Sequence, residues 1–332
     1  MERGPADTAR GAEPGTLEAS DALGALGAVG AAGPADRLVR AVERVLAHAG
    51  VDSPRADAEL LVAFAAQVTR GDLQHAALLG RPVLSGPEQL ERLHGLVRDR
   101  AARVPLQHLT GTAPFRHLEL TVGPGVFVPR PETEVVAQVA IDEARRVVAA
   151  RGTAVVVDLC TGSGAVALAI AQEVPGAQVH AVELDAQAHA WAQRNVDALA
   201  LGVTLVRGDA RTALPGLDGR CDVVVSNPPY VPTGAVPRDR EVAEHDPAVA
   251  LYGLGPDGLE VPRGVTRAAA RLLVPGGLYV MEHAEVQDAG AREMVDALEQ
   301  FEHASTLPDL TGRPRMVVAR RRGPSVVEDS SS

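Results

Sequence analysis

The sequence predicts an α/β protein in which helices cover both faces of a mostly parallel sheet, preceded by a small helical domain. Three observations support this prediction. From about residue 132, amphipathic helical stretches alternate with short apolar runs, which is typical of a covered parallel sheet. Apolar residues recur at helical spacing before residue 104. Near the C-terminus, a turn too short for a helical crossover joins two strand-like runs, so the last strand should run antiparallel.

The sheet strands are expected where apolar runs are bounded by polar or glycine residues. They are residues 155–159, 178–183, 204–207, 222–226, 278–282, 301–307 and 315–320. Amphipathic helices such as 186–200 and 259–273 lie between them. Seven strands in one domain require a long continuous region, and we assign residues 129–322 to it.

Three helices are expected in the N-terminal domain, residues 36–104. The first ends at Gly50, the second begins after Ser53 as N-cap with Pro54 in its first turn, and the third follows Gly86-Pro87. This domain either only stabilises the protein or docks a macromolecular substrate, and the sequence favours neither interpretation.

Alternating apolar residues from Leu118 to Val122 predict a strand or hairpin within residues 105–128, between the two domains. The stretches 1–35 and 323–332 have low complexity, so we expect both to be disordered.

Composition narrows the class of protein. The 332 residues are 46% hydrophobic with a net charge of -11, which makes a nucleic-acid partner less expected. Cys160 and Cys221 do not suggest a disulfide framework. With no apolar run of about 18 residues and no basic-led signal region, we expect a cytoplasmic protein without a membrane partner. No metal ion is expected.

The run from Val155 to Gly164 predicts a strand, a tight turn and a helix. Glycines let the backbone of such a turn approach a ligand closely, and ligands of open parallel sheets bind at the carboxyl ends of strands. A phosphate-binding loop would carry a Lys after the glycines, and a dinucleotide loop would carry three spaced glycines. Neither pattern is present. The candidate ligand-binding residues are Cys160, Thr161, Gly162, Ser163 and Gly164.

Two acids follow the next strands. Glu183 ends the second strand, a position suited to a carboxylate that holds both hydroxyls of a ribose. Asp209, beside Ala210, follows the third strand and is placed to meet an adenine amino group. Each acid alone is a common loop or cap residue. Together with the glycine turn, they indicate a nucleoside-bearing ligand. Cys160 is interpreted as a buried turn residue rather than a nucleophile.

The fourth strand ends in Asn227-Pro228-Pro229-Tyr230. The prolines stiffen the backbone and fix the Asn227 side chain and the Pro228 carbonyl, two acceptors that can hold the hydrogens of one amino or amide group. Tyr230 can lie against the flat face of that group. The alternative is an ordinary turn, since Asn and Pro are turn formers. We prefer a reactive site, because an aromatic residue here is unusual in a chain with three Tyr.

These features suit methyl transfer from S-adenosylmethionine to a planar nitrogen. A sulfonium methyl is already electrophilic, whereas an amide nitrogen is a poor nucleophile. Holding both hydrogens of that nitrogen would align it, and positioning of this kind contributes roughly 7–11 kcal/mol in favourable cases.

The chain resembles the protein-(glutamine-N5) methyltransferases that modify class 1 peptide-chain release factors, over about residues 37–320. Asn-Pro-Pro-Tyr alone is shared with DNA adenine methyltransferases, whereas the Pro-Arg-Pro-Glu-Thr-Glu stretch and the helical N-terminal domain are specific. The resemblance rests on Pro105 to Gly111 with Phe115, Phe127 to Glu134, Asp158 to Gly164, Asn227 to Tyr230, Asp246 to Leu251, Asp257 to Leu259, Glu282-His283, and Asp309 to Arg313.

The resemblance implies a seven-stranded S-adenosylmethionine-dependent methyltransferase fold. It implies that the acceptor is the glutamine of the release factor's Gly-Gly-Gln motif, so that methylation tunes translation termination. Asn227 and the turn, acid and Ala210 positions named above would bind the donor, and Asn227 to Tyr230 the glutamine. The stretch with Arg130 and Glu132 would bind substrate and cover the site between the domains.

Three positions depart from the family pattern. Cys160 stands where the family usually has Gly, so we expect its backbone to avoid a glycine-only angle. Glu183 stands where Asp is common, and its extra methylene should still reach a ribose. His245-Asp246 replaces an aromatic-Glu pair, which leaves its role open.

Two rival functions remain. A nucleic-acid amino methyltransferase would share the tetrapeptide, but residues 36–103 carry about ten Arg against nine acids, which is not a basic domain. A non-catalytic binding protein would have lost the Asn or the glycines, and both are present.

Overall fold

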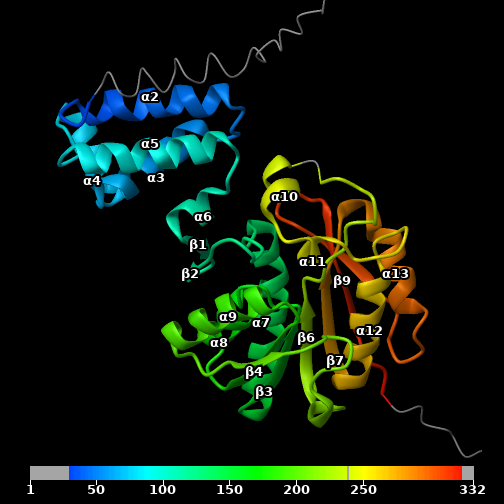
Figure 1. Cartoon of the computed structure of the whole chain (residues 1–332). Helices are drawn as coiled ribbons and strands as arrows, with labels where there is room; N and C mark the ends of the chain where they lie inside the picture. The colour runs from blue at the N-terminus through cyan, green and yellow to red at the C-terminus, as the bar shows by residue number, and fades with distance from the viewer. Residues whose placement is uncertain (1–29, 238, 324–332) are drawn as a thin grey trace, which may run out of the picture. The chain divides into compact units, whose positions relative to one another are not determined.

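The computed structural model describes residues 30–237 and 239–323. The described chain forms two compact units that divide between Thr110 and Gly111 (Figure 1). The disorder expected at the chain ends falls almost entirely on residues 1–29 and 324–332, which lie outside the described residues. Residues 30–34 form a turn that leads into the first described helix.

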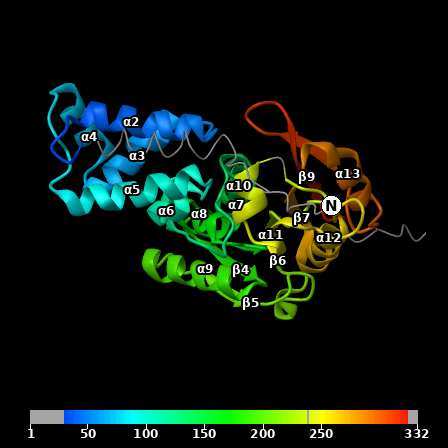
Figure 2. The same cartoon turned by 45° about the horizontal axis from the view of Figure 1, so that its top comes forward.

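The N-terminal unit is helical, and its three expected helices are confirmed. They are α2 (Ala35–His48), α3 (Pro54–Ala66) and α5 (Pro87–Ala101), which lie side by side (Figure 2). Their buried faces share one apolar cluster. Ser53 occupies the N-cap position of α3, but its side chain makes no capping hydrogen bond.

Two helices in this unit were not predicted. Helix α4 (Arg70–Leu78) begins at a capping box in which Thr69 and Asp72 satisfy each other's backbone N–H groups. Helix α6 (Leu106–Thr110) is a single turn at the start of the stretch expected to be a strand or hairpin. The expected hairpin follows it as β1 (Thr112–Phe115) and β2 (Leu118–Thr121).

The second unit holds a seven-stranded sheet with the order β5-β4-β3-β6-β7-β9-β8. Strands β3 to β7 run parallel, whereas β9 pairs antiparallel with both β7 and β8. The predicted α/β class and antiparallel last strand are confirmed. The strands are β3 (Ala154–Leu159), β4 (Ala177–Glu183), β5 (Thr204–Arg207), β6 (Cys221–Ser226), β7 (Leu273–Glu282), β8 (Ser305–Pro308) and β9 (Pro314–Arg320).

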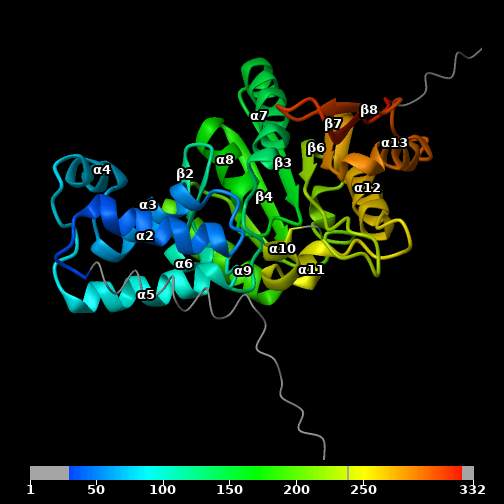
Figure 3. The same cartoon turned by 90° about the horizontal axis from the view of Figure 1, so that it is seen from above.

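Helices cover both faces of the sheet (Figure 3). Successive residues of a strand point to opposite faces, so Val223 and Val225 of β6 face one apolar cluster while Val224 faces the other. The first cluster is built with α7 (Pro131–Arg151), α8 (Ala165–Glu173) and α9 (Ala186–Leu199). The second is built with α12 (Glu260–Leu272) and α13 (Asp288–Asp296).

The order of the strands determines where a ligand can bind to the sheet. From β3 the chain proceeds to β4 and β5 on one side and then crosses to β6 on the other. The carboxyl ends of β3 and β6 are therefore the switch point of the sheet, where open α/β sheets form ligand crevices. Two short helices, α10 (Arg240–His245) and α11 (Ala248–Leu251), follow β6 at this edge. No helix in the described part of the chain is long and apolar enough to span a membrane.

Candidate active site

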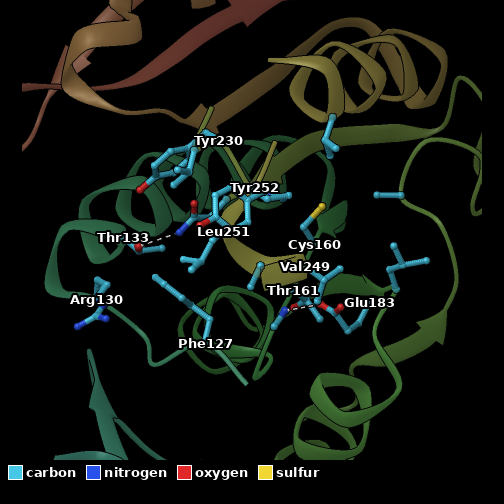
Figure 4. A pocket seen from close by; sticks show the side chains of 18 of the residues that line it. Phe127, Arg130, Thr133, Cys160, Thr161, Glu183, Tyr230, Val249, Leu251 and Tyr252 are labelled. Atoms are coloured by element: carbon cyan, nitrogen blue, oxygen red, sulfur yellow. Dashed lines mark hydrogen bonds between the residues drawn. The ribbon is translucent and has the colours of Figure 1, made fainter. Parts of the chain in front are cut away.

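A cavity of about 1120 Å³ lies at the carboxyl ends of the parallel strands (Figure 4). Three of the predicted site residues do not line it: Gly164 and Pro228 are buried, and Glu132 is exposed. The structure brings the other predicted site residues together as its lining: Arg130, Cys160, Thr161, Gly162, Ser163, Glu183, Asp209, Ala210, Asn227, Pro229 and Tyr230.

The glycine turn and Glu183 are bonded to each other. The Glu183 carboxylate accepts hydrogen bonds from the Gly162 N–H and the Asp185 N–H, each at 2.8 Å. Burial raises the pKa of Glu183. A carboxylate has about four lone-pair sites, so two backbone bonds fix its direction and leave acceptor capacity toward the cavity.

Hydrogen bonds to two buried side chains also fix the turn after β3. Buried Asp158 accepts from the Thr161 hydroxyl at 2.5 Å and from the Ala167 N–H at 3.2 Å, and burial raises its pKa to about 7. Asn195 of α9 donates to the Ser163 carbonyl and bonds both main-chain groups of Thr121. These bonds shape the loop independently of any ligand.

Cys160 adopts a backbone angle that glycine favours but that is not restricted to glycine. Its φ is +65°, so the backbone enters the left-handed region. That region is open to residues with a side chain but costs them roughly 1–2 kcal/mol, and the bonded loop around Cys160 imposes it. Burial raises the pKa of the Cys160 thiol, which agrees with a turn residue and not a nucleophile.

Cys160→Gly should therefore be more stable than Cys160→Ala. Both variants lose the sulfur, but only glycine relieves the left-handed backbone, so we expect the free energies of unfolding to differ by about 1 kcal/mol. Urea unfolding of the two proteins measures this difference. Equal stabilities would show that φ at this position carries no cost.

Asp209 lines the cavity, but its carboxylate is engaged. Both oxygens accept from the Arg211 guanidinium, at 2.6 to 3.0 Å, and this neighbour lowers the pKa of Asp209. A contact between Asp209 and an adenine amino group stays a prediction, and it would use the acceptor capacity that Arg211 leaves.

At the other end of the cavity, Asn227 belongs to a chain of hydrogen bonds that passes through Thr133, which is labelled in Figure 4. Its Nδ2 donates to Thr133 Oγ1 at 3.2 Å, and Thr133 Oγ1 donates to Glu282 Oε2 at 2.8 Å. The side-chain oxygen of Asn227 therefore remains available to the cavity. Thr133 and Glu282 are buried.

The tetrapeptide backbone is clamped by two neighbouring segments. Gln287 donates from Nε2 to the carbonyls of Tyr230 and Asp257, both at 2.8 Å. Gly253 and Gly258 pack so closely against the tetrapeptide that a Cβ at Gly258 would lie 2.2 Å from the Tyr230 carbonyl oxygen. These contacts fix where Tyr230 stands.

Arg130 and Asp246 form an ion pair, with Nη2 and Oδ2 3.1 Å apart. Burial raises the pKa of Asp246 to about 6 even though Arg130 opposes this shift. The pair joins the start of α7 to the segment after α10, so the structure gives Asp246 a partner that the sequence did not reveal. Among the described residues, no group of His, Cys, Asp and Glu side chains is arranged to hold a metal ion.

Comparison with known proteins decides the family. Residues 37–111 match the model of the PrmC N-terminal domain, and residues 131–244 match that of the methyltransferase small domain. The release factor glutamine methyltransferase of Streptomyces coelicolor is 48% identical over 288 residues, covering 86% of this chain and 98% of the relative. Its counterpart in Mycolicibacterium smegmatis is 46% identical over 283 residues, covering 85% and 96%.

The chain belongs to the release factor glutamine methyltransferase family. It is thus an S-adenosylmethionine-dependent methyltransferase. A relative with a different substrate in its name, the 4-amino-L-phenylalanine/4-methylamino-L-phenylalanine methyltransferase of Streptomyces pristinaespiralis, is 42% identical over 266 residues, which cover 79% of this chain and 87% of that one.

The residues present suit the methyl donor of this methyltransferase family. A close-approach turn at Gly162, where a Cβ would meet nothing within 4 Å, faces a carboxylate already oriented by backbone N–H groups. That donor set is suited to a nucleoside with two free ribose hydroxyls.

Sequence reasoning missed Thr133, Glu282, Gln287 and Asn195 as site residues. Thr133 gave a signal, since it lies on one helical stripe with Val136, Ala137 and Ala140, all buried. A hydroxyl on the inward face of a helix needs a partner. The other three act through contacts between distant segments, which no local sequence pattern reports.

The buried Glu282 carboxyl makes the folded methyltransferase sensitive to pH. Burial raises its pKa from 4.5 to about 7, against the opposing effects of Thr133, Arg315 and Tyr230 and with the help of Glu132. The folded state therefore retains this proton when the unfolded chain has lost it. The resulting stabilisation is full below about pH 4.5 and is lost as pH rises to about 7.

Glu282→Gln, which is neutral at every pH, should consequently gain stability relative to the wild type across this range, by up to roughly 3 kcal/mol. Urea unfolding between pH 4.5 and 8 tests this, with Glu285→Gln at an exposed neighbouring site as control. Parallel stability curves for the wild type and Glu282→Gln would contradict the expectation.

Proposed function

We propose that the protein methylates the side-chain amide nitrogen of the glutamine in the Gly-Gly-Gln motif of class 1 peptide-chain release factors, in the cytoplasm, and so tunes translation termination. The observation that supports this most directly is the orientation of Asn227. Its N–H is bound by Thr133, which leaves its oxygen to accept a hydrogen from an incoming planar amide.

In this proposal, one end of the cavity binds the methyl donor and the other end binds the glutamine amide. Glu183, held by Gly162 and Asp185, accepts the ribose hydroxyls of S-adenosylmethionine, with Asp209 and Ala210 beside the adenine. The bound donor supplies an electrophilic methyl group. Asn227, which lines the cavity, accepts one of the amide hydrogens, which keeps the nitrogen lone pair directed at the methyl group.

The apolar lining completes the site. Tyr230, Phe127, Leu251 and Tyr252 line the cavity. They exclude water, and the aromatic rings among them offer flat surfaces to a planar amide. Arg130 contributes a positive charge for a backbone carbonyl of the substrate, whereas exposed Glu132 would contact the release factor only outside the cavity.

The helical N-terminal unit is proposed to dock the release factor. Leu78, 87% exposed at the end of α4, is an apolar side chain available for such a contact. Leu78→Glu should raise the KM for intact release factor and leave the rate with a short Gly-Gly-Gln peptide unchanged. If Leu78→Glu leaves the KM for intact release factor unchanged, the N-terminal unit would be favoured as one that only stabilises the protein.

A substrate panel tests the proposal. Labelled methyl transfer is measured with release factor, with duplex DNA and with free 4-amino-L-phenylalanine. We expect transfer to the release factor alone. Transfer to DNA but not to release factor would support the rival nucleic-acid methyltransferase, and failure to bind S-adenosylmethionine by calorimetry would support a non-catalytic protein.

A further inference from the structure

We infer that Thr133 and Glu282 are positioning residues that determine which end of the Asn227 amide faces the substrate. The inference rests on the proposed role of Asn227 in holding the glutamine amide. Both side chains are buried next to the tetrapeptide. Neither of them is chemically changed by the reaction.

The three side chains come from three separate elements. Thr133 lies in the first turn of α7, Asn227 directly follows β6, and Glu282 ends β7. Their bonds are 3.2 Å from Asn227 to Thr133 and 2.8 Å from Thr133 to Glu282. Thr133 is 5% exposed and Glu282 is 3% exposed, so water does not compete for these bonds.

The order of donors and acceptors fixes the amide. When it is ionised, above its raised pKa of about 7, the Glu282 carboxylate can only accept, so it takes the single proton of the Thr133 hydroxyl. The Thr133 oxygen can then only accept from Asn227, and the amide must present its NH₂ group to Thr133. The opposite orientation would direct the hydroxyl to the Asn227 oxygen and leave a buried oxygen of Glu282 without that donor.

This order has a direct effect on the reaction. With the NH₂ group bound, the Asn227 oxygen faces the cavity and can accept a hydrogen of the substrate amide. With the amide reversed, two N–H groups would face each other and the glutamine nitrogen would be pushed out of line.

The test compares Thr133→Val, which keeps the shape but removes the hydroxyl, with Thr133→Ser, which keeps the hydroxyl. For Thr133→Val we expect kcat with release factor to fall by about 10²-fold, with little change in KM or in S-adenosylmethionine affinity. Thr133→Ser should recover most of the lost kcat. A side chain that merely stabilises the fold would not split kcat from KM in this way.

A double variant separates this inference from the proposed function. If Thr133 acts through Asn227, then Thr133→Val combined with Asn227→Ala should be no slower than Asn227→Ala alone. Glu282→Gln, which can donate as well as accept, should lower kcat by an amount between those of the Ser and Val variants. It also provides a second measurement if Thr133→Val does not fold.

The outcomes are distinct. Normal kcat in Thr133→Val beside an inactive Asn227→Ala would overturn the inference and leave the proposed function standing. So would additive losses in the double variant, or an equal loss of donor affinity in Thr133→Val. An active Asn227→Ala would instead overturn the proposed role of Asn227 itself.

Discussion

Asn227→Ala is expected to remove nearly all methyl transfer while largely sparing the affinity for S-adenosylmethionine. The alanine removes the acceptor that would align the glutamine nitrogen, and loss of one preorganised hydrogen-bonding group in a catalytic site costs about 10²- to 10³-fold in kcat. The bonds that shape the Glu183 end of the cavity do not include Asn227. Single-turnover kinetics and calorimetric titration of the donor measure the two effects.

Gln193→Ala is a matched control, because it also removes a side-chain amide that makes one side-chain hydrogen bond, here to Asp197 on α9. This variant should keep wild-type activity. Near-normal transfer by Asn227→Ala would exclude the mechanism, whereas loss of donor binding in that variant would mean that Asn227 serves mainly the donor.

Gly258→Ala should inactivate the enzyme although the added methyl group would contact neither the donor nor the release factor. Its φ is +72°, and an added Cβ would lie 2.2 Å from the Tyr230 carbonyl oxygen and 2.8 Å from the Pro232 nitrogen. Because these are backbone atoms, the tetrapeptide itself must shift. A displacement of about 1 Å at such a site can cost 10²-fold in rate, and kcat with release factor measures it.

Gly255→Ala controls for the backbone angle. Gly255 lies in the same loop with φ +70°, but its nearest contact would be Asp257 Oδ1 at an ordinary 3.5 Å. Both variants bear the cost of a left-handed alanine, and only Gly258→Ala bears the clash. The account requires a much larger loss of kcat for Gly258→Ala. Similar losses in the two variants would show that loop strain, and not displacement of the tetrapeptide, is responsible.

Much of the fold follows from local pattern. The buried strand β6 centres on three consecutive Val residues. The strand after it begins earlier than expected, at Leu273, because its first residues pair across a register shift. Strand β8 begins at Ser305 instead of residue 301, since Phe301 makes only an isolated bridge to Arg321. The turn between β8 and β9 was short enough to predict antiparallel pairing, but the insertion of β9 beside β7 was not visible.

The site was predictable to the extent that parallel strands end at one edge. Glu183 and Asn227 each follow a strand, and the sheet brings them to one cavity. The bonds that orient them join residues far apart in the sequence, such as Thr133 and Glu282, 149 positions apart. Neither spacing nor composition reports such a contact, and the left-handed turn at Cys160 is imposed by its surroundings rather than by the residue itself.

One glutamine amide of the release factor is proposed to receive the methyl group. Mass spectrometry of the Gly-Gly-Gln peptide from release factor, incubated with S-adenosylmethionine with and without enzyme, tests it most directly. We expect a gain of one methyl group on the glutamine side chain only when enzyme is present. An unmodified glutamine, or a methyl group on another residue of the factor, would contradict it.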